Sequence, residues 1–312
     1  MDAWYAILKG MLQGATEFIP VSSSAHLVLF RTLTDILGYP PPNPFVDEFF
    51  DITLHLGTLL AVLIYFRHEI TRFIHAVVYR TPTVKDNNGQ VWQTFPLLWG
   101  GFLAFSVTSV FALVGLKGSE VLFAKLQHWP LLKGVPDMTQ FYIHHPEYIA
   151  LNLFLTGCLL AFAEKQSAKA TPLHEASTEE ALHLAPLQVI SIGVAQSVAA
   201  IFRGISRSGS TMATALLCGL SRPQAARFSF WLSIPIFGSA AVYESYKLAK
   251  VGIAYESLPW VSILLGMFAS FVVGYACIAW LLKLLVRFPL TVFSYYCWAL
   301  SIGMFVYFRV AT

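Results

Sequence analysis

Charge is what this sequence has least of. Of its 312 residues, 12% are Asp, Glu, Lys or Arg and 56% are hydrophobic, whereas soluble domains usually carry about 25% charged residues. That composition excludes an ordinary soluble domain, and a net charge of only +3 gives no reason to expect a nucleic-acid partner. The apolar runs are continuous rather than alternating, and several are long enough to cross a bilayer, which takes roughly 20 residues. Because only helices and closed barrels satisfy their own backbone groups in hydrocarbon, we predict an all-α integral membrane protein built as a helical bundle.

Cysteine is scarce too, and a cleavable signal sequence is missing. The four cysteines lie apart in apolar stretches without CxxC spacing, so we expect small packing residues rather than disulfides or a metal site. The first apolar stretch contains Glu17, breaks at Pro20 and has only Lys9 as an early positive charge. Such a stretch does not match a signal peptide, and we expect it to remain in the mature protein. The cysteines are Cys158, Cys218, Cys277 and Cys297.

A polar linker over residues 164–186 divides the chain into two halves, 1–163 and 187–312, that share a weak internal repeat. Each half begins with an apolar helix carrying Gly-x-x-Gln, followed by a Pro or Gly break and a Ser-rich helix start. The two Gly-x-x-Gln segments are Gly10–Gln13 and Gly193–Gln196. We interpret the halves as an inverted repeat within a single membrane domain.

The break in each half leaves two segments of about 15 residues, too short to span a bilayer separately. Paired short segments at corresponding places in two halves are typical of broken helices at a binding site. We therefore predict re-entrant helical hairpins at 4–37 and 187–220. About six full transmembrane helices remain, near residues 50–66, 94–116, 147–163, 222–246, 259–283 and 289–308. The basic residues are densest in the 67–93 loop, which favours a cytoplasmic position for that loop and an outside position for both termini.

The first break holds one group of candidate residues. Gln13 and Glu17 are four residues apart and share a helical face, and a carboxylate in an apolar segment costs about 2.5–3.5 kcal/mol on insertion scales. We interpret Glu17, with Gln13, as a metal ligand or a base that orients water; a structural pair with an arginine is the alternative. Pro20 ends the helix, and three serines and a histidine open the next one: Ser22, Ser23, Ser24 and His26.

The second break is the stronger local signal. Small residues there let successive backbone N–H groups converge at a helix N-terminus, which favours anions. Arg207 adds a planar guanidinium that matches phosphate oxygens bidentately. The segment lacks the GK[ST] ending of a Walker loop. The predicted phosphate-binding residues are Ser22 from the first break and Gly204, Ser206, Arg207, Ser208, Gly209, Ser210 and Thr211 from the second.

Together the two breaks predict one site for a diphosphate. Arg207 and the backbone amides would hold the anion, while Glu17 would need a divalent cation to avoid repelling it. Mg²⁺ or Ca²⁺ fits an all-oxygen ligand set, and it would stabilise the charge of phosphoryl transfer. We prefer Ser23 as the nucleophile with His26 as a proton shuttle, and direct attack by water remains the alternative.

At these residues the chain resembles the undecaprenyl-diphosphate phosphatase family, the bacitracin-resistance proteins of bacterial inner membranes. The family pattern is E/Q-x-x-x-E, then P-V-S-S-x-x-H, and later P-G-x-S-R-S-G-x-T. Here it stands as Gln13–Glu17, Pro20–His26 and Gly204–Thr211, and the likeness continues through 54–62. Two departures are Gln13, the uncharged choice at its position, and Arg203, which replaces the family's Pro.

The resemblance implies hydrolysis of undecaprenyl diphosphate to the monophosphate, which recycles the lipid carrier for peptidoglycan synthesis and lessens the effect of bacitracin. It also implies a place in the inner membrane, among membrane lipids, with the active site facing the periplasm. The substrate partner is then a polyprenyl diphosphate; homodimer formation is left open.

Two other classes of protein compete with this assignment. Membrane phosphatases with PSGH and SRxxxxxHxxxD motifs need a histidine after the Ser–Arg pair, but the last histidine here is His183, so that class is excluded. A transporter or flippase of the lipid phosphate also fits inverted repeats with broken helices.

Two further polar residues, Asp51 and His55, lie one helical turn apart. We interpret them as a structural polar pair; the alternative is that they support the site.

Overall fold

A computed structural model describes residues 2–39, 44–85, 91–125, 129, 141–142, 145–169, 185–251 and 258–310. These residues form helices and one short β-hairpin, which confirms the predicted all-α class. The elements are α1 (Ala3–Phe18), α2 (Ser23–Ile36), α3 (Pro44–Tyr65), α4 (Arg67–Val78), β1 (Thr83–Lys85), β2 (Val91–Gln93), α5 (Thr94–Lys125), α7 (Glu147–Ser167), α8 (Pro186–Ile201), α9 (Arg207–Leu217), α10 (Arg222–Val251), α11 (Trp260–Arg287) and α12 (Thr291–Val310).

The long helices carry the membrane-spanning character. Within the described ranges, 5 helices are long and apolar enough to cross a membrane, and a bent pair, α3 with α4, raises the number to 6. The protein is thus a multi-pass membrane protein, as the composition predicted. Each predicted span contains a helix. The helix α5 is longer than its predicted span, because it ends at Lys125 and not near residue 116. The 70° bend between α3 and α4 was not predicted.

Both predicted breaks separate two helices. Phe18 ends α1 and Ser22 caps α2, while Ile201 ends α8 and Ser206 caps α9. The observed pairs, α1–α2 and α8–α9, occupy the places predicted for the hairpins at 4–37 and 187–220. The assignment of halves 1–163 and 187–312 as an inverted repeat stays a prediction.

The start of the predicted polar linker belongs to α7, which continues to Ser167. Glu164, taken as the first linker residue, is buried and accepts hydrogen bonds from Arg222 Nε at 2.9 Å and from the backbone N–H of Leu290 at 3.0 Å. Residues 170–184 of the linker lie outside the described part. Glu164 therefore ties the end of α7 to the starts of α10 and α12.

Glycines allow α1 to pack directly on α11. A Cβ added at Gly10 would lie 2.1 Å from the backbone oxygen of Gly266, and one at Gly14 would lie 2.5 Å from that of Ser270. Gly193 of α8 approaches α5 in the same way, 2.9 Å from the oxygen of Ala104. The glycines that the sequence paired as a repeat thus lie at two helix crossings.

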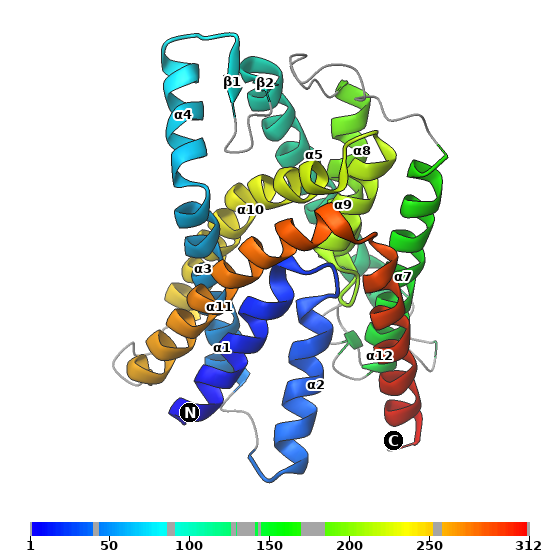
Figure 1. Ribbon diagram of the computed structural model, residues 1–312. Helices are drawn as coiled ribbons and strands as arrows, with labels where there is room; N and C mark the ends of the chain where they lie inside the picture. The colour runs from blue at the N-terminus through cyan, green and yellow to red at the C-terminus, as the bar shows by residue number, and fades with distance from the viewer. Residues whose placement is uncertain are drawn as a thin grey trace.

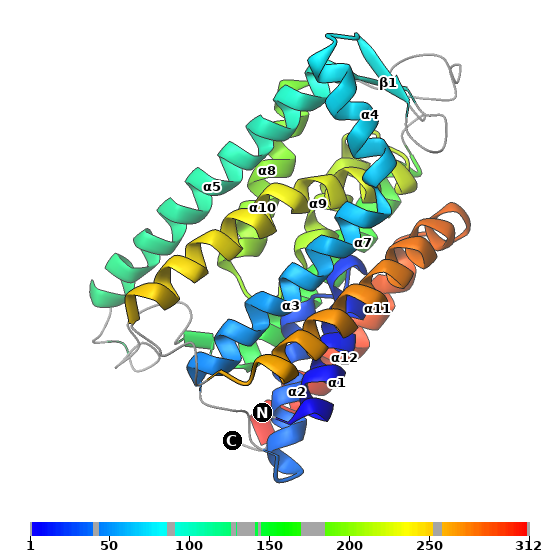
Figure 2. The ribbon, with the colours of Figure 1, turned by 90° about the vertical axis from the view of Figure 1, so that its left-hand side faces the viewer.

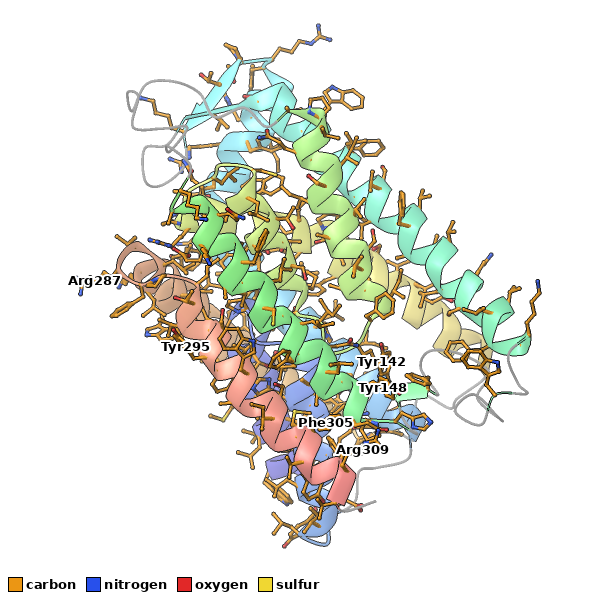
Figure 3. All side chains as sticks on the ribbon, turned by 90° about the vertical axis from the view of Figure 1, so that its right-hand side faces the viewer. Tyr142, Tyr148, Arg287, Tyr295, Phe305 and Arg309 are labelled. Atoms are coloured by element: carbon orange, nitrogen blue, oxygen red, sulfur yellow. The ribbon has the colours of Figure 1, made fainter. Side chains whose placement is uncertain are left out.

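The bundle has two distinct ends. The start of α1 and the end of α12 lie at one end, and α4 with the β-hairpin lies at the other (Figures 1 and 2). Along α12, Tyr295, Phe305 and Arg309 project from the outer surface (Figure 3), and Tyr295 is 67% exposed. An outer surface of exposed apolar and aromatic side chains is what a helix facing lipid requires. The predicted sites lie where the two breaks meet, between these ends.

Candidate active site

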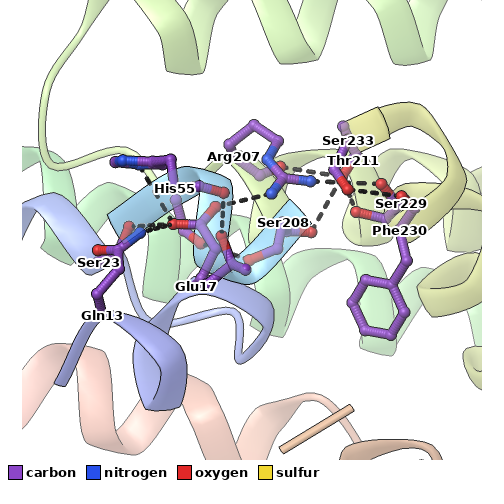
Figure 4. A network of polar contacts seen from close by, with 12 residues as sticks. Gln13, Glu17, Ser23, His55, Arg207, Ser208, Thr211, Ser229, Phe230 and Ser233 are labelled. Carbon is purple, nitrogen blue, oxygen red and sulfur yellow. Dashed lines mark hydrogen bonds and ion pairs between the residues drawn. The ribbon is translucent and has the colours of Figure 1, made fainter. Parts of the chain in front are cut away.

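An ion pair joins the two breaks. Arg207 Nη2 donates a hydrogen bond to Glu17 Oε1 at 2.8 Å, and the Glu17 side chain is only 5% exposed. Figure 4 shows the Glu17 carboxylate with Arg207 on one side and with Gln13, Ser23 and His55 on the other. The two residues that the sequence placed in one site are therefore in direct contact.

Serine hydroxyls also bridge the two breaks. The N–H of Gly204 donates to Ser24 Oγ at 3.2 Å, and Ser208 Oγ donates to the carbonyl oxygen of Ile19 at 3.2 Å. The prediction that the two interrupted segments meet is confirmed. The openings of α2 and α9 consequently lie beside the same carboxylate, and both are helix N-termini, each capped by a serine hydroxyl.

Unusual backbone conformations shape each break. Ser22 has φ of 67°, a value uncommon outside glycine, and its hydroxyl caps α2 by accepting from Ala25 N. Gly204 has φ of 98°, and a Cβ there would lie 2.4 Å from the oxygen of Ile149, so this position requires glycine. Strained positions of this kind persist where the surroundings over-determine them, and they cluster at functional sites.

The first break surrounds Glu17 Oε2 with donors. Gln13 Nε2 donates to this oxygen at 2.7 Å, and Ser23 Oγ donates to it at 2.8 Å. Gln13 is fully buried, and its Oε1 has no hydrogen-bond partner. A buried polar atom without a partner is costly unless something outside the protein satisfies it. Gln13 Oε1 is therefore an acceptor that a bound cation or water would satisfy.

Arg207, at the start of α9, is held by residues of α10. Its Nη1 donates to the carbonyl oxygen of Ser229 at 3.3 Å, and the guanidinium lies 4.7 Å from the ring centre of Phe237. Arg207 Nε and Ser210 Oγ are buried without partners. Arg207, which contacts Glu17, thus has an unused donor, and Gln13, which contacts the same carboxylate, has an unused acceptor. An unused donor suits a bound anion, and an unused acceptor suits a bound cation.

The other predicted phosphate-binding residues have mixed positions. Ser206 caps α9 by accepting from Gly209 N at 3.0 Å, so neither group is free in this state. The hydroxyl of Thr211 is engaged with the backbone of its own helix and with Ser229 Oγ at 2.5 Å. Ser22 Oγ pairs with Ser24 Oγ, and Ser208 contacts the opposite break. These residues form hydrogen bonds within and between the breaks, whereas Arg207 Nε and the buried Ser210 Oγ have no hydrogen-bond partner.

His26 has other partners. Its Nδ1 donates to the carbonyl oxygen of Ser22 at 2.8 Å, and its Nε2 accepts from the hydroxyl of Tyr296 at 2.7 Å. The two rings are also stacked, with centroids 5.7 Å apart. Both ring nitrogens are therefore engaged toward α2 and α12, away from the Glu17–Arg207 pair, and the role of His26 as proton shuttle stays a prediction. Arg203, which replaces the family's Pro, is exposed, and its carbonyl oxygen accepts a hydrogen bond from Asn152.

Sequence reasoning missed how closely His55 and Phe237 approach the pair. His55 Nε2 lies 3.6 Å from Glu17 Oε2, and the His55 ring packs edge-on against Phe237, the ring that also contacts Arg207. A signal was present: His55 ends a series of polar residues, one per turn, that begins with Asp47 and Asp51.

Those two aspartates belong to a buried charge cluster. Lys9, whose side chain is fully buried, lies 2.5 Å from Asp47 Oδ1 and 2.6 Å from Asp51 Oδ1. Arg31 lies 2.7 Å from Asp47 Oδ2 and also pairs with Asp51. The two positive and two negative charges balance, so the cluster ties α1, α2 and α3 together without excess buried charge. Asp51 and His55 are therefore not a pair with each other alone.

Protein side chains alone do not complete a metal centre here. Among the described residues, no group of three or more His, Cys, Asp or Glu side chains is arranged to hold a metal ion. Glu17 Oε2 and the unpartnered Gln13 Oε1 are hard oxygen donors of the kind that Mg²⁺ and Ca²⁺ bind. The donor set fits a divalent cation whose remaining ligands come from substrate oxygens or water.

Comparison with known proteins gives the family. The sequence model described as "Bacitracin resistance protein BacA" matches residues 6–303. Three similar proteins are each named undecaprenyl-diphosphatase. They come from Colwellia psychrerythraea (36% identical, covering 87% of this chain and 86% of the relative), Teredinibacter turnerae (33%, 87% and 86%) and Deinococcus radiodurans (31%, 88% and 83%). On the match over nearly its whole length, this chain belongs to the BacA family of bacitracin resistance proteins.

Proposed function

We propose that the chain is an undecaprenyl-diphosphatase, which hydrolyses undecaprenyl diphosphate to undecaprenyl phosphate and inorganic phosphate. The relatives' printed name supports this activity. The single observation that carries it is the Glu17–Arg207 contact, which places a carboxylate and a phosphate-matching guanidinium at two facing helix openings. The lipid carrier is thereby recycled for peptidoglycan synthesis, and less diphosphate remains for bacitracin to capture.

Arg207 and the start of α9 bind the diphosphate. The unpartnered Arg207 Nε and Ser210 Oγ donate to phosphate oxygens, and the N-terminus of α9 adds N–H groups that favour an anion. Arg207 exchanges part of its contact with Glu17 for contact with phosphate, since a guanidinium has several donors. Binding of substrate thus frees the Glu17 carboxylate for chemistry.

Ser23 and Glu17 carry the chemical step. Ser23 Oγ already donates to Glu17 Oε2 at 2.8 Å, within the reach that a nucleophile and its base require. Ser23 Oγ attacks the terminal phosphorus, its proton passes to Glu17, and the bond from phosphorus to the bridging oxygen breaks to release undecaprenyl phosphate. Water then cleaves the serine phosphate to regenerate Ser23. In the alternative route, Glu17 orients a water that attacks the same phosphorus directly. A role for His26 as proton shuttle requires that it exchange its contact with Ser22 or Tyr296 for one with the site.

A divalent cation, Mg²⁺ or Ca²⁺, completes the site in this proposal. Glu17 and Gln13 would hold it, because both offer hard oxygens and Gln13 Oε1 has no partner in the protein. The cation supplies Lewis-acid stabilisation of the charge that develops on the transferring phosphoryl group.

The proposed location is the bacterial inner membrane, among membrane lipids, with the active site open to the periplasm. The diphosphate carried by the lipid is charged, whereas the polyprenyl chain is apolar. A site between two helix breaks, with apolar helices around it, matches both parts of such a substrate. The positive charge of residues 67–93, a predicted loop that instead contains α4 and both strands, supports a cytoplasmic position for the α4 end of the bundle.

Phosphate release by detergent-purified protein tests the proposal, because no gradient exists in detergent and transport alone releases nothing. We expect release from undecaprenyl diphosphate by the wild type and a loss of about 10³-fold or more in Glu17→Ala and Arg207→Ala. Glu120→Ala and Arg287→Ala are matched controls, since both side chains are exposed and lie on other helices. Full release by the two site variants, or none by the wild type, would refute the assignment.

A further inference from the structure

Phe237 of α10 lies against two residues that flank the Glu17 carboxylate. Its ring centre is 4.7 Å from the guanidinium carbon of Arg207, and the ring packs edge-on against the imidazole of His55, with centroids 5.4 Å apart. Arg207 donates to Glu17 Oε1, whereas His55 Nε2 lies 3.6 Å from Glu17 Oε2. One aromatic side chain therefore contacts a neighbour of the carboxylate on each side.

The contact between Phe237 and Arg207 is a close and sheltered one. Elsewhere in the described part of the chain, the Lys and Arg groups that lie over an aromatic ring are 5.4–5.8 Å from its centre. A cation over a ring is attracted by the negative potential of the ring face, and the attraction grows where water is excluded. Phe237 is 8% exposed and the Arg207 side chain 13%, so little water reaches this contact.

The ring holds the guanidinium without using its hydrogen-bond donors. Arg207 Nη2 donates to Glu17, Nη1 donates to the carbonyl oxygen of Ser229 at 3.3 Å, and Nε has no partner. The N–H groups of a guanidinium point outward in its plane, whereas an aromatic ring attracts its delocalised charge. A phosphate can therefore bind Nε and replace Glu17 at Nη2 while the contact with Phe237 is kept.

We propose that Phe237 is a positioning residue for the diphosphate group: its ring face keeps the Arg207 guanidinium in place while the arginine exchanges carboxylate for phosphate. Without this contact the long arginine side chain gains freedom when it leaves Glu17, and ordering it again costs affinity for the anion. The inference deepens the proposed function and rests on it for the identity of the anion.

A buried phenylalanine can also serve only to fill space between helices, and the two roles depend on different properties of the ring. Filling space depends on its size and shape, whereas holding a cation depends on the negative potential of its face. Fluorine atoms withdraw electron density from that face and change the size of the ring little. A series of fluorinated phenylalanines at position 237 therefore separates the two roles.

The test introduces phenylalanine, 4-fluorophenylalanine, 3,5-difluorophenylalanine or 3,4,5-trifluorophenylalanine at position 237 of the full-length protein by nonsense-codon suppression. The dissociation constant of methylenediphosphonate, a diphosphate that is not hydrolysed, is measured for each purified protein with Mg²⁺ present. We expect the affinity to fall with each added fluorine, by roughly 5- to 30-fold over the whole series. The kcat/KM for undecaprenyl diphosphate should fall in the same order.

The same series at Phe230 is the matched control, because Phe230 lies on the same helix, is fully buried and packs edge-on against Phe18. The affinity should stay constant there. A constant affinity across the series at position 237, an equal fall at position 230, or no binding of the diphosphonate by the wild type overturns the inference. The fall should persist in His55→Gln; its disappearance would assign the effect to the histidine and overturn the inference too.

Phosphate release by the wild type is measured separately, so that the two proposals fail in different ways. An active wild type whose affinity does not change with fluorination at position 237 contradicts only the role of Phe237. An inactive wild type whose affinity follows the number of fluorine atoms contradicts only the proposed function.

Discussion

Arg207 Nη2 lies 2.8 Å from Glu17 Oε1, although 190 residues separate the two in the sequence. Either charge alone would be expensive inside an apolar bundle, whereas the pair is neutral and hydrogen-bonded. In the proposed reaction the same contact holds the catalytic carboxylate in place until a phosphate competes for the arginine. The predictions below follow from this pair and from the helices that position it.

Ser23→Ala removes the proposed nucleophile. If Ser23 attacks phosphorus, phosphate release falls about 10²–10⁴-fold, since the remaining rate comes from water positioned by the same groups. Mass spectrometry of wild-type protein quenched during turnover should show one added phosphate on Ser23. Ser191→Ala, on the exposed side of α8, is the control. If Ser23→Ala keeps the wild-type rate and the quenched wild-type enzyme carries no phosphate on Ser23, then water must attack the phosphorus directly.

Removal of divalent cations should abolish activity, because Glu17 then repels the substrate phosphates. Incubation with EDTA is expected to stop phosphate release, and an excess of Mg²⁺ or Ca²⁺ to restore it. Activity that is indifferent to the chelator would exclude a cation from the reaction.

Gly10→Ala should weaken the packing of α1 on α11. The added methyl would lie 2.1 Å from the oxygen of Gly266, so the two backbones must separate, and overpacking of this kind costs about 1–3 kcal/mol. We expect an apparent unfolding temperature several degrees below that of Gly303→Ala, where an added Cβ meets nothing within 4 Å. Equal thermal stability of the two variants would mean that α1 and α11 are not closely packed.

Lys9→Met should destabilise the protein strongly. It leaves Asp47 and Asp51 with one cation in place of two, and breaking a buried ion pair costs about 3–5 kcal/mol. Adding Asp47→Asn restores the balance of charge, so the double variant should recover part of the loss in a denaturant titration in detergent. If Lys9→Met alone is as stable as the wild type, the ion pairs of Lys9 with Asp47 and Asp51 are not buried.

The local sequence was enough to predict the helices, the two breaks and their meeting. Periodicity and chain length determine where apolar helices run, and the Pro, Gly and Ser residues mark where they stop. The correspondence of the two breaks then placed Glu17 and Arg207 in one site. A direct ion pair of Glu17 with an arginine was only the alternative interpretation. These inferences depend on local pattern and on charge, both of which a sequence displays.

Most other contacts between segments far apart in the sequence could not be predicted in this way. The hydrogen bond from Tyr296 to His26 joins residues 270 apart, and no local pattern distinguishes it from packing. The polar residues Asp47, Asp51 and His55 on α3 face Lys9, Gln13 and Glu17 on α1, with the same spacing of four residues. Matching those two series would have placed His55 beside Glu17. The bend after Tyr65 and the continuation of α5 to Lys125 depend on tertiary packing, which overrides local preference.

A double-mutant cycle on Glu17 and Arg207 tests most directly whether the two breaks form one site. Phosphate release is measured for Glu17→Gln, Arg207→Lys and the double variant, under conditions where every rate remains above background. When two residues act as one unit, the second substitution adds little to the loss that the first one causes. The double variant should therefore release phosphate about as slowly as the slower single variant. If the two losses multiply instead, Glu17 and Arg207 act independently and the single anion site is contradicted.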